Sequence, residues 1–108
     1  MTKNILLFFF ISLFVSTAFA QKNLDKRASK ITQKMTKALS LDEEQKLKVY
    51  KIQLNRYQEV ATIRKDYKDD PQSRKAELKK VYNRLYGKLR KALGKDKMQE
   101  WANYKQNN

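Results

Sequence analysis

Hydrophobic residues recur at helical spacing along the chain after about residue 20. The clearest stripe has members three or four positions apart: Leu24, Ala28, Ile31, Met35 and Leu39. Residues at this spacing share one face of an α-helix, so the stripe predicts a helix with one buried side. The same pattern, interpreted between the breaks in the chain, predicts helices over about residues 24–39, 42–67, 71–93 and 97–105.

Few residues interrupt these predicted helices. Pro71 disfavours helix at the residue before it but suits a first helical turn, and Gly94 suits the position just after a helix. No segment of the sequence alternates as a β-strand would, and the residues that dominate it favour helix. We therefore expect an all-α protein, a small bundle or hairpin of about four helices of which two are long and two shorter.

The second predicted helix carries two apolar faces. One is formed by Leu47, Tyr50, Leu54, Tyr57 and Ala61. The other, about 130° away around the helix, is formed by Val49, Ile52, Val60, Ile63 and Tyr67. A helix that packs against a single layer needs only one apolar face. The second face leaves three interpretations open: a central position in the monomer, a subunit interface that closes a homodimer, or a surface for another protein.

The first 20 residues have the features of a secretory signal peptide. Lys3 precedes an apolar run over residues 5–15, and Ala18 and Ala20 occupy the small-residue positions before the expected cleavage site. The run is shorter than the roughly 20 residues that span a bilayer, so we prefer a cleaved signal to a retained anchor helix. We expect residues 21–108 to form a single helical domain, periplasmic or secreted, with no membrane span.

Charge is distributed unevenly along the chain. Lys and Arg number 25 against 11 acidic residues, which gives a net charge of +14. Seven acids fall at predicted helix starts, where unpaired N–H groups and the helix dipole stabilise them: Asp25, Asp42, Glu43, Glu44, Asp69, Asp70 and Asp96. The helix bodies are left basic, and the third carries a stripe formed by Lys80, Arg84, Lys88 and Lys91. This stripe is either a solvated face or a contact strip for an anionic partner.

The acidic run at residues 42–44 fits helix capping better than metal binding. Asp42 and Gln45 have the spacing of a capping box, as do Ser40 and Glu43, and the sequence does not separate the two. Adjacent helical positions point in different directions, and the chain has no His to complete a metal site. The sequence also has no Cys, no Gly-rich phosphate loop and no G-x-S-x-G elbow. We therefore expect neither an enzyme nor a cofactor or metal site.

The stretch LDEEQ resembles a known motif. Leu41, Asp42 and Gln45 stand at the Leu, Thr and Gln positions of the LTxxQ pattern, which marks the Spy/CpxP-like family of periplasmic proteins. Asp in place of Thr keeps the N-cap chemistry. A second copy near the C-terminus is degenerate, because Gly94 and Lys97 stand where Thr and Gln are expected. The resemblance implies an all-α, often dimeric, cradle-like protein that binds unfolded proteins without ATP or acts in envelope stress.

We therefore expect an ATP-independent, chaperone-like protein or envelope-stress adaptor whose partners are unfolded or acidic proteins. Apolar and basic side chains of the second and third helices are the candidate client-binding residues: Ile52, Ile63, Tyr67, Lys80, Arg84 and Lys88. The alternative is a secreted cationic structural or binding protein for an anionic envelope component such as lipopolysaccharide. Export argues against nucleic acid as a partner, and no groove-reading motif supports one.

Overall fold

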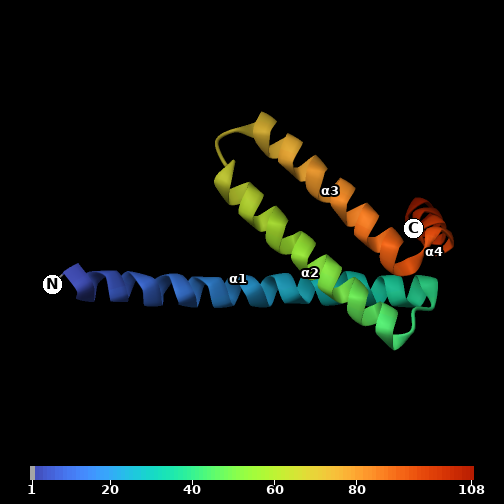
Figure 1. Ribbon diagram of the computed structural model, residues 1–108, viewed down its shortest axis with the longest axis horizontal. Helices are drawn as coiled ribbons and strands as arrows, with labels where there is room; N and C mark the ends of the chain where they lie inside the picture. Colours follow the sequence, from blue (N-terminus) through green and yellow to red (C-terminus); the bar gives the residue numbers. More distant parts are fainter. Residues whose placement is uncertain (1) are drawn as a thin grey trace.

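The computed structural model describes the backbone of residues 2–108 and the side chains of residues 21–108. The described chain is helical, with no strand, and its helices in order are α1 (Thr2–Leu39), α2 (Glu43–Asp66), α3 (Pro71–Leu93) and α4 (Lys95–Asn107) (Figure 1). The predicted all-α fold is confirmed, and α2 and α3 lie within a residue of their expected bounds.

The first and last helices are longer than predicted. Helix α1 begins at Thr2 instead of near Leu24, because residues 21–23 contain no Pro or Gly that would stop a helix. Helix α4 begins directly after Gly94 and continues to Asn107. The predicted signal peptide, residues 1–20, lies outside the part of the chain whose side chains are described.

Helix α2 is the central helix of the fold. It pairs with α3 in an antiparallel hairpin and packs on α1 along its other side, while α4 turns back at the end of α3 and packs on α1 and α3 (Figure 1). Helices α1 and α3 cover most residues of the two apolar faces of α2, whereas Leu47 is 55% exposed and Ala61 is exposed. A central position in the monomer, the first of the three interpretations, therefore accounts for most of both faces.

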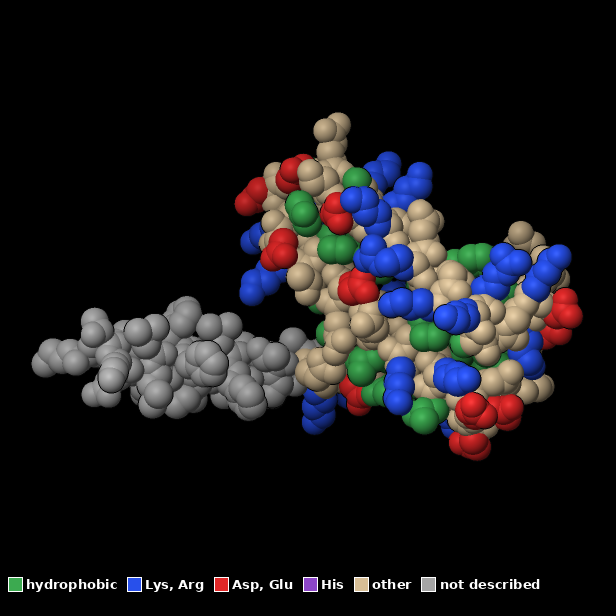
Figure 2. Space-filling view, viewed as in Figure 1, with side chains coloured by type: hydrophobic (Ala, Val, Ile, Leu, Met, Phe, Trp, Pro, Cys, Tyr) green, Lys and Arg blue, Asp and Glu red, His purple; other side chains and the backbone are tan. Residues whose placement is uncertain are grey.

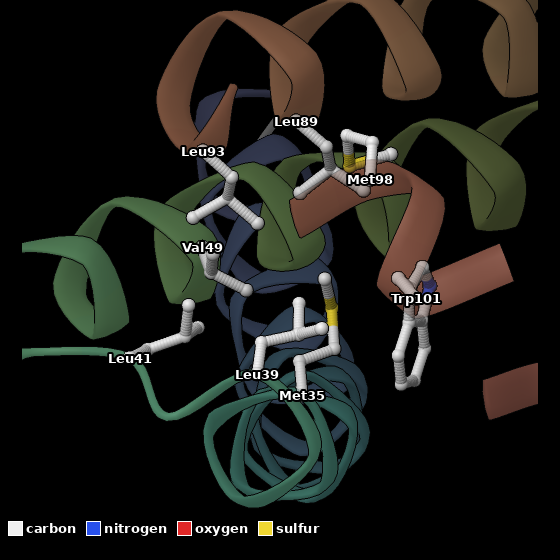
Figure 3. Close-up of a cluster of buried hydrophobic side chains, with 8 residues drawn as sticks. All are labelled: Met35, Leu39, Leu41, Val49, Leu89, Leu93, Met98 and Trp101. Atoms are coloured by element: carbon white, nitrogen blue, oxygen red, sulfur yellow. The ribbon is translucent and has the colours of Figure 1, made fainter. Parts of the chain in front are cut away.

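One hydrophobic core lies where the C-terminal end of α1 meets the other three helices. Eight buried side chains form it: Met35, Leu39, Leu41, Val49, Leu89, Leu93, Met98 and Trp101. Figure 3 shows these side chains converging between the helices, with Met98 and Trp101 contributed by α4. Met35 and Val49 are fully buried, and truncating a residue such as Met35 to Ala removes about 2–5 kcal/mol of stability in cores of this kind.

The turn between α1 and α2 decides between the two competing caps. Asp42 is the N-cap of α2: its Oδ1 accepts the Gln45 N–H at 2.8 Å, and Gln45 Oε1 accepts the Asp42 N–H at 3.2 Å. Ser40 instead ends α1 in the left-handed region, with φ 51°. The next residue, Leu41, donates its N–H to the Thr36 carbonyl at 3.2 Å, as in a Schellman motif, and is buried in the core. The capping box at Asp42 is therefore confirmed.

Gly94 joins α3 to α4 without a loop. Its φ of 90° and ψ of 165° lie in a region that only glycine adopts readily, and its N–H closes α3 on the Arg90 carbonyl at 2.8 Å. Three residues later, Lys97 Nζ donates to the Leu39 carbonyl at 2.8 Å. An ammonium group at this position donates to a carbonyl that has no partner within the helix, and it is attracted to the negative end of the α1 dipole. Lys97 thus binds α4 to the C-terminal end of α1, next to the hydrophobic core.

Candidate functional site

A groove opens beside the core, and we call it the aromatic groove. Its cavity volume is about 370 Å³. It is lined by Ile31, Gln53, Arg56, Tyr82, Leu85, Tyr86, Leu89, Met98, Trp101 and Lys105, so all four helices contribute to it. Its floor belongs to the core, because Leu89, Met98 and Trp101 are buried. An apolar cleft with a few polar groups at its edge is the usual form of a binding site.

The wall of the aromatic groove exposes aromatic side chains. Tyr82 is 46% exposed and Tyr86 is 55% exposed, although both are large and mainly apolar. They stand one turn apart on α3, so their rings line the same side of that helix. On α4, the rings of Trp101 and Tyr104 stack with centroids 5.5 Å apart. The groove therefore offers ring surfaces that the protein itself leaves partly uncovered.

Basic side chains hold fixed positions at the edge of the aromatic groove. The Arg56 guanidinium lies 4.3 Å from the centre of the Tyr57 ring and 5.9 Å from that of Tyr82. Lys105 Nζ lies 5.7 Å from the ring centre of Trp101. Cations at these distances are attracted to the negative faces of the rings, which orients them without neutralising their charge. The edge of the groove is therefore both aromatic and positively charged.

A second depression continues from the aromatic groove along α1. It has a volume of about 320 Å³ and shares Ile31 with the groove; its other lining residues are Arg27, Lys30, Lys34 and Tyr57. The three basic residues follow one another at spacings of three and four along the exposed side of α1. A chain lying across Ile31 would pass from the aromatic rings to this basic row.

A separate basic depression lies on α2 and α3, and we call it the lysine hollow. Its volume is about 470 Å³, and its lining residues are Lys48, Lys51, Ile52, Lys88, Lys91 and Ala92. Figure 2 shows Lys and Arg side chains spread over the helix bodies, with acidic ones gathered at the hairpin turn and at the turn between α1 and α2. The prediction that acids cluster at helix ends and leave the bodies basic agrees with this distribution.

The six predicted client-binding residues do not form one site. Ile52 and Lys88 meet in the lysine hollow. Lys80 Nζ pairs with Glu77 at 3.0 Å, and Arg84 Nη2 pairs with Glu59 across the hairpin at 2.5 Å. Ile63 and Tyr67 are half-buried in the second half of α2 and its cap, away from both cavities. The basic stripe on α3 is thus partly neutralised at Lys80 and Arg84.

Sequence reasoning missed the residues that make the aromatic groove. The predicted binding residues did not include Arg56, Tyr82, Tyr86, Trp101 or Lys105. One feature of the sequence could have indicated the groove: Tyr82 and Tyr86 are large aromatic residues one turn apart on a helix that is otherwise rich in charged residues. The cavity itself depends on the angle between α3 and α4, which no spacing within one helix reveals.

The fold and these surfaces define a small, strongly basic, four-helix protein with an aromatic groove. A family model described as a domain of unknown function, DUF4890, matches residues 17–107, and the chain belongs to this family. No curated protein and no solved structure matches the chain. Within the part of the chain that the structure describes, no helix is long and apolar enough to cross a membrane.

Proposed function

We propose that this protein holds unfolded or partly folded acidic polypeptides in the aromatic groove, without ATP, as a periplasmic chaperone or envelope-stress adaptor. The observation that carries the proposal is a groove whose exposed rings, Tyr82 and Tyr86, stand beside two cations, Arg56 and Lys105. Neither cation forms an ion pair with an acid among residues 21–108. Unfolded chains offer both of the groups this surface fits, namely apolar side chains and carboxylates.

Charge selects the class of client. The whole chain carries a net charge of +14, and the groove continues into the basic row formed by Arg27, Lys30 and Lys34. A surface of this sign raises the rate at which acidic chains reach it and repels basic ones. Electrostatic attraction thus brings acidic segments to the groove before any apolar contact forms.

Apolar contact then prolongs the encounter without trapping the client. Each exposed ring supplies about 0.5–1.5 kcal/mol to an aromatic contact, so a few such contacts give a weak complex. A weak complex dissociates unaided, which is the behaviour that holding without ATP requires. The LTxxQ-like stretch at Leu41, Asp42 and Gln45 supports the proposal through the family it resembles.

The test is suppression of aggregation of a denatured acidic protein, followed by light scattering in low salt. We expect protection by the wild-type protein and about fivefold weaker protection by Tyr86→Ser, the equivalent of about 1 kcal/mol of lost ring contact. Leu47→Ser is the matched control, because Leu47 and Tyr86 are both 55% exposed but Leu47 lies outside the groove. No protection at several-fold excess of wild-type protein, or equal loss in both variants, would contradict the proposal.

A further inference from the structure

The lysine hollow has its charge at the rim and its apolar side chains at the floor. The rim is formed by four exposed lysines, two from each helix of the hairpin: Lys48 and Lys51 of α2, and Lys88 and Lys91 of α3. The floor is formed by Ile52 and Ala92, which are half-buried and pack against the hydrophobic core. A ligand that fills the hollow must therefore place an apolar group at its centre and negative charges on either side of that group.

The protein neutralises little of the charge at this rim. Among residues 21–108, Lys48 forms an exposed ion pair with Glu44 at 3.4 Å, and the other three rim lysines form none. An exposed pair is weak, because water screens it and two long side chains lose freedom when they pair. None of the six described residues that line the hollow is acidic. The rim therefore stays available to carboxylates from outside the chain.

The lysine hollow and the aromatic groove open on different sides of the α2–α3 pair. Lys88 follows Tyr82 by six residues, which turns it about 120° away around α3. Lys48 precedes Gln53 by five residues and is turned about 140° from it around α2. The hollow and the groove can therefore be occupied at the same time.

Three kinds of anionic ligand fit this arrangement to different degrees. An anionic polymer such as polyphosphate presents charge alone and leaves the apolar floor uncovered. A fatty acid carries its charge at one end of its hydrocarbon, so it meets the cations on one side of the floor. An extended polypeptide turns side chains two residues apart to the same side, about 7 Å from each other. A segment with an apolar residue between two acids, each two positions away, therefore matches both the floor and the rim.

We propose that the lysine hollow is a second client-binding site, which takes extended segments in which an aliphatic residue is flanked by two acids. This inference rests on the proposed function, because it assigns the hollow to the same acidic clients as the aromatic groove. The groove offers exposed rings, whereas the six described residues that line the hollow include no aromatic one. A client long enough to reach both sites is held at two points, which raises its overall affinity through the effective concentration of the second segment.

The experiment is an NMR titration of the full-length protein with a short peptide, in low salt. The peptide has one leucine, with a glutamate two positions before it and another two positions after it, in a glycine and serine background. Bound in the hollow, it should shift the methyl signal of Ala92 on the floor and leave the indole N–H signal of Trp101 in the groove unchanged. Movement of the Trp101 signal without the Ala92 signal would overturn the proposal.

Two double variants test the rim. Exposed charge pairs contribute up to about fivefold each, so Lys88→Gln with Lys91→Gln should weaken binding of the peptide roughly five- to tenfold. The matched control is Lys75→Gln with Lys79→Gln, which removes the same charge from exposed positions of α3 outside the hollow. It should weaken binding less than about twofold, because charge away from the contact acts only through the screened overall field. Equal losses in the two double variants would contradict a site at the rim.

Two altered peptides test the order of charge and hydrocarbon. Serine in place of the leucine removes the contact with the floor and should weaken binding about fivefold. A peptide of the same composition with both glutamates on one side of the leucine should bind about threefold more weakly, because its charge reaches one side of the rim only. Equal binding of all three peptides would show a site for charge alone and would overturn the proposal.

The outcome is distinguishable from that of client holding in the groove. Tyr86→Ser removes a ring of the groove and should change the affinity of the hollow for the peptide by less than about twofold, because the two sites share no residue. Peptide binding at Ala92 without aggregation suppression by the wild-type protein would contradict client holding in the groove and leave the hollow as a binding site. Aggregation suppression without peptide binding at Ala92 would overturn the hollow alone.

Discussion

Arg56 and Gln53 are joined on α2: Arg56 Nη1 donates a hydrogen bond to Gln53 Oε1 at 3.1 Å. Gln53 is buried, and its own amide Nε2 reaches Met35 Sδ on α1 at 3.5 Å. The buried glutamine thus links the core to the edge of the aromatic groove. It holds the guanidinium in the position from which it approaches the rings of Tyr57 and Tyr82.

Replacing Gln53 should affect client holding more than it affects the stability of the fold. We expect Gln53→Leu to change the free energy of unfolding by less than about 1.5 kcal/mol, because leucine has a similar volume. The substitution leaves two groups without their partner, the weak sulfur acceptor of Met35 and the half-buried guanidinium of Arg56. Arg56 loses the acceptor that holds its guanidinium in place. Protection of an acidic client against aggregation should therefore fall toward the level of Arg56→Gln, a variant that has no guanidinium. Urea denaturation and light scattering measure the two effects. A Gln53→Leu protein that protects as well as wild type would show that Arg56 needs no anchor.

The two glycines of the chain should respond to alanine with opposite signs. Gly94→Ala should lower the free energy of unfolding by about 1–3 kcal/mol, because the φ of 90° there strains any residue with a Cβ. Gly87 lies in the exposed interior of α3 with nothing within 4 Å of an added Cβ, so Gly87→Ala should raise it by up to about 1 kcal/mol. Urea titration of the two variants measures both changes. If the free energy of unfolding shifts in the same direction in both, the different roles given to the two glycines are wrong.

The cap of α2 is tested by changing its two competing residues. Asp42→Ala should lower the free energy of unfolding by about 1 kcal/mol, since it removes the acceptor for the Gln45 N–H. Ser40→Gly should leave that free energy unchanged or raise it, because the left-handed backbone at Ser40 suits glycine. Thermal or urea unfolding distinguishes them. A loss of stability in Ser40→Gly comparable to that in Asp42→Ala would place the cap at Ser40.

Acid should weaken the start of α3 through Asp70. The hydrogen bonds that the Asp70 carboxylate accepts from Ser73, together with nearby Arg74, hold the pKa of this carboxyl below its ordinary value of 3.8. The carboxylate therefore stabilises the folded state fully above the ordinary pKa, and this contribution disappears as the pH falls through the lowered one. Hydrogen exchange of the Ser73 amide, followed from about pH 5 to about pH 2, should accelerate in wild type beyond the intrinsic pH trend.

Asp70→Asn is the control for this titration. Asparagine keeps an oxygen acceptor for the Ser73 N–H but has no proton to gain in this range. Its Ser73 protection should therefore follow the intrinsic exchange trend alone. If both proteins lose protection in parallel, another group controls the acid response of the hairpin.

Helix positions could be predicted from the sequence because they depend on local spacing. Of the stripe that predicted the first helix, Ala28, Met35 and Leu39 are buried in the structure. Pro71 and Gly94 marked the start and the end of α3, since each acts through its own backbone. The choice between Ser40 and Asp42 as cap could not be made, because both spacings satisfy the same rule and only the backbone of the turn distinguishes them.

The candidate site was only partly predictable because it forms between helices. Ile52 and Lys88 were recognised as an apolar and a basic residue, but their meeting in one hollow depends on the register of α2 against α3. Arg84 was assigned to a free basic stripe, whereas Glu59, 25 positions earlier, lies opposite it and pairs with it. Spacing within a helix gives the direction of a side chain and not the identity of what it meets.

The bond from Lys97 to the Leu39 carbonyl spans 58 positions of the chain. Met98 and Trp101, which complete the same corner, also follow every other member of the core in the sequence. During synthesis from the N-terminus, the core therefore stays uncovered on this side until residues 97–101 have emerged and α4 has packed. A chain that stops before Met98 would leave this side of the core, including Met35 and Leu39, accessible to proteases.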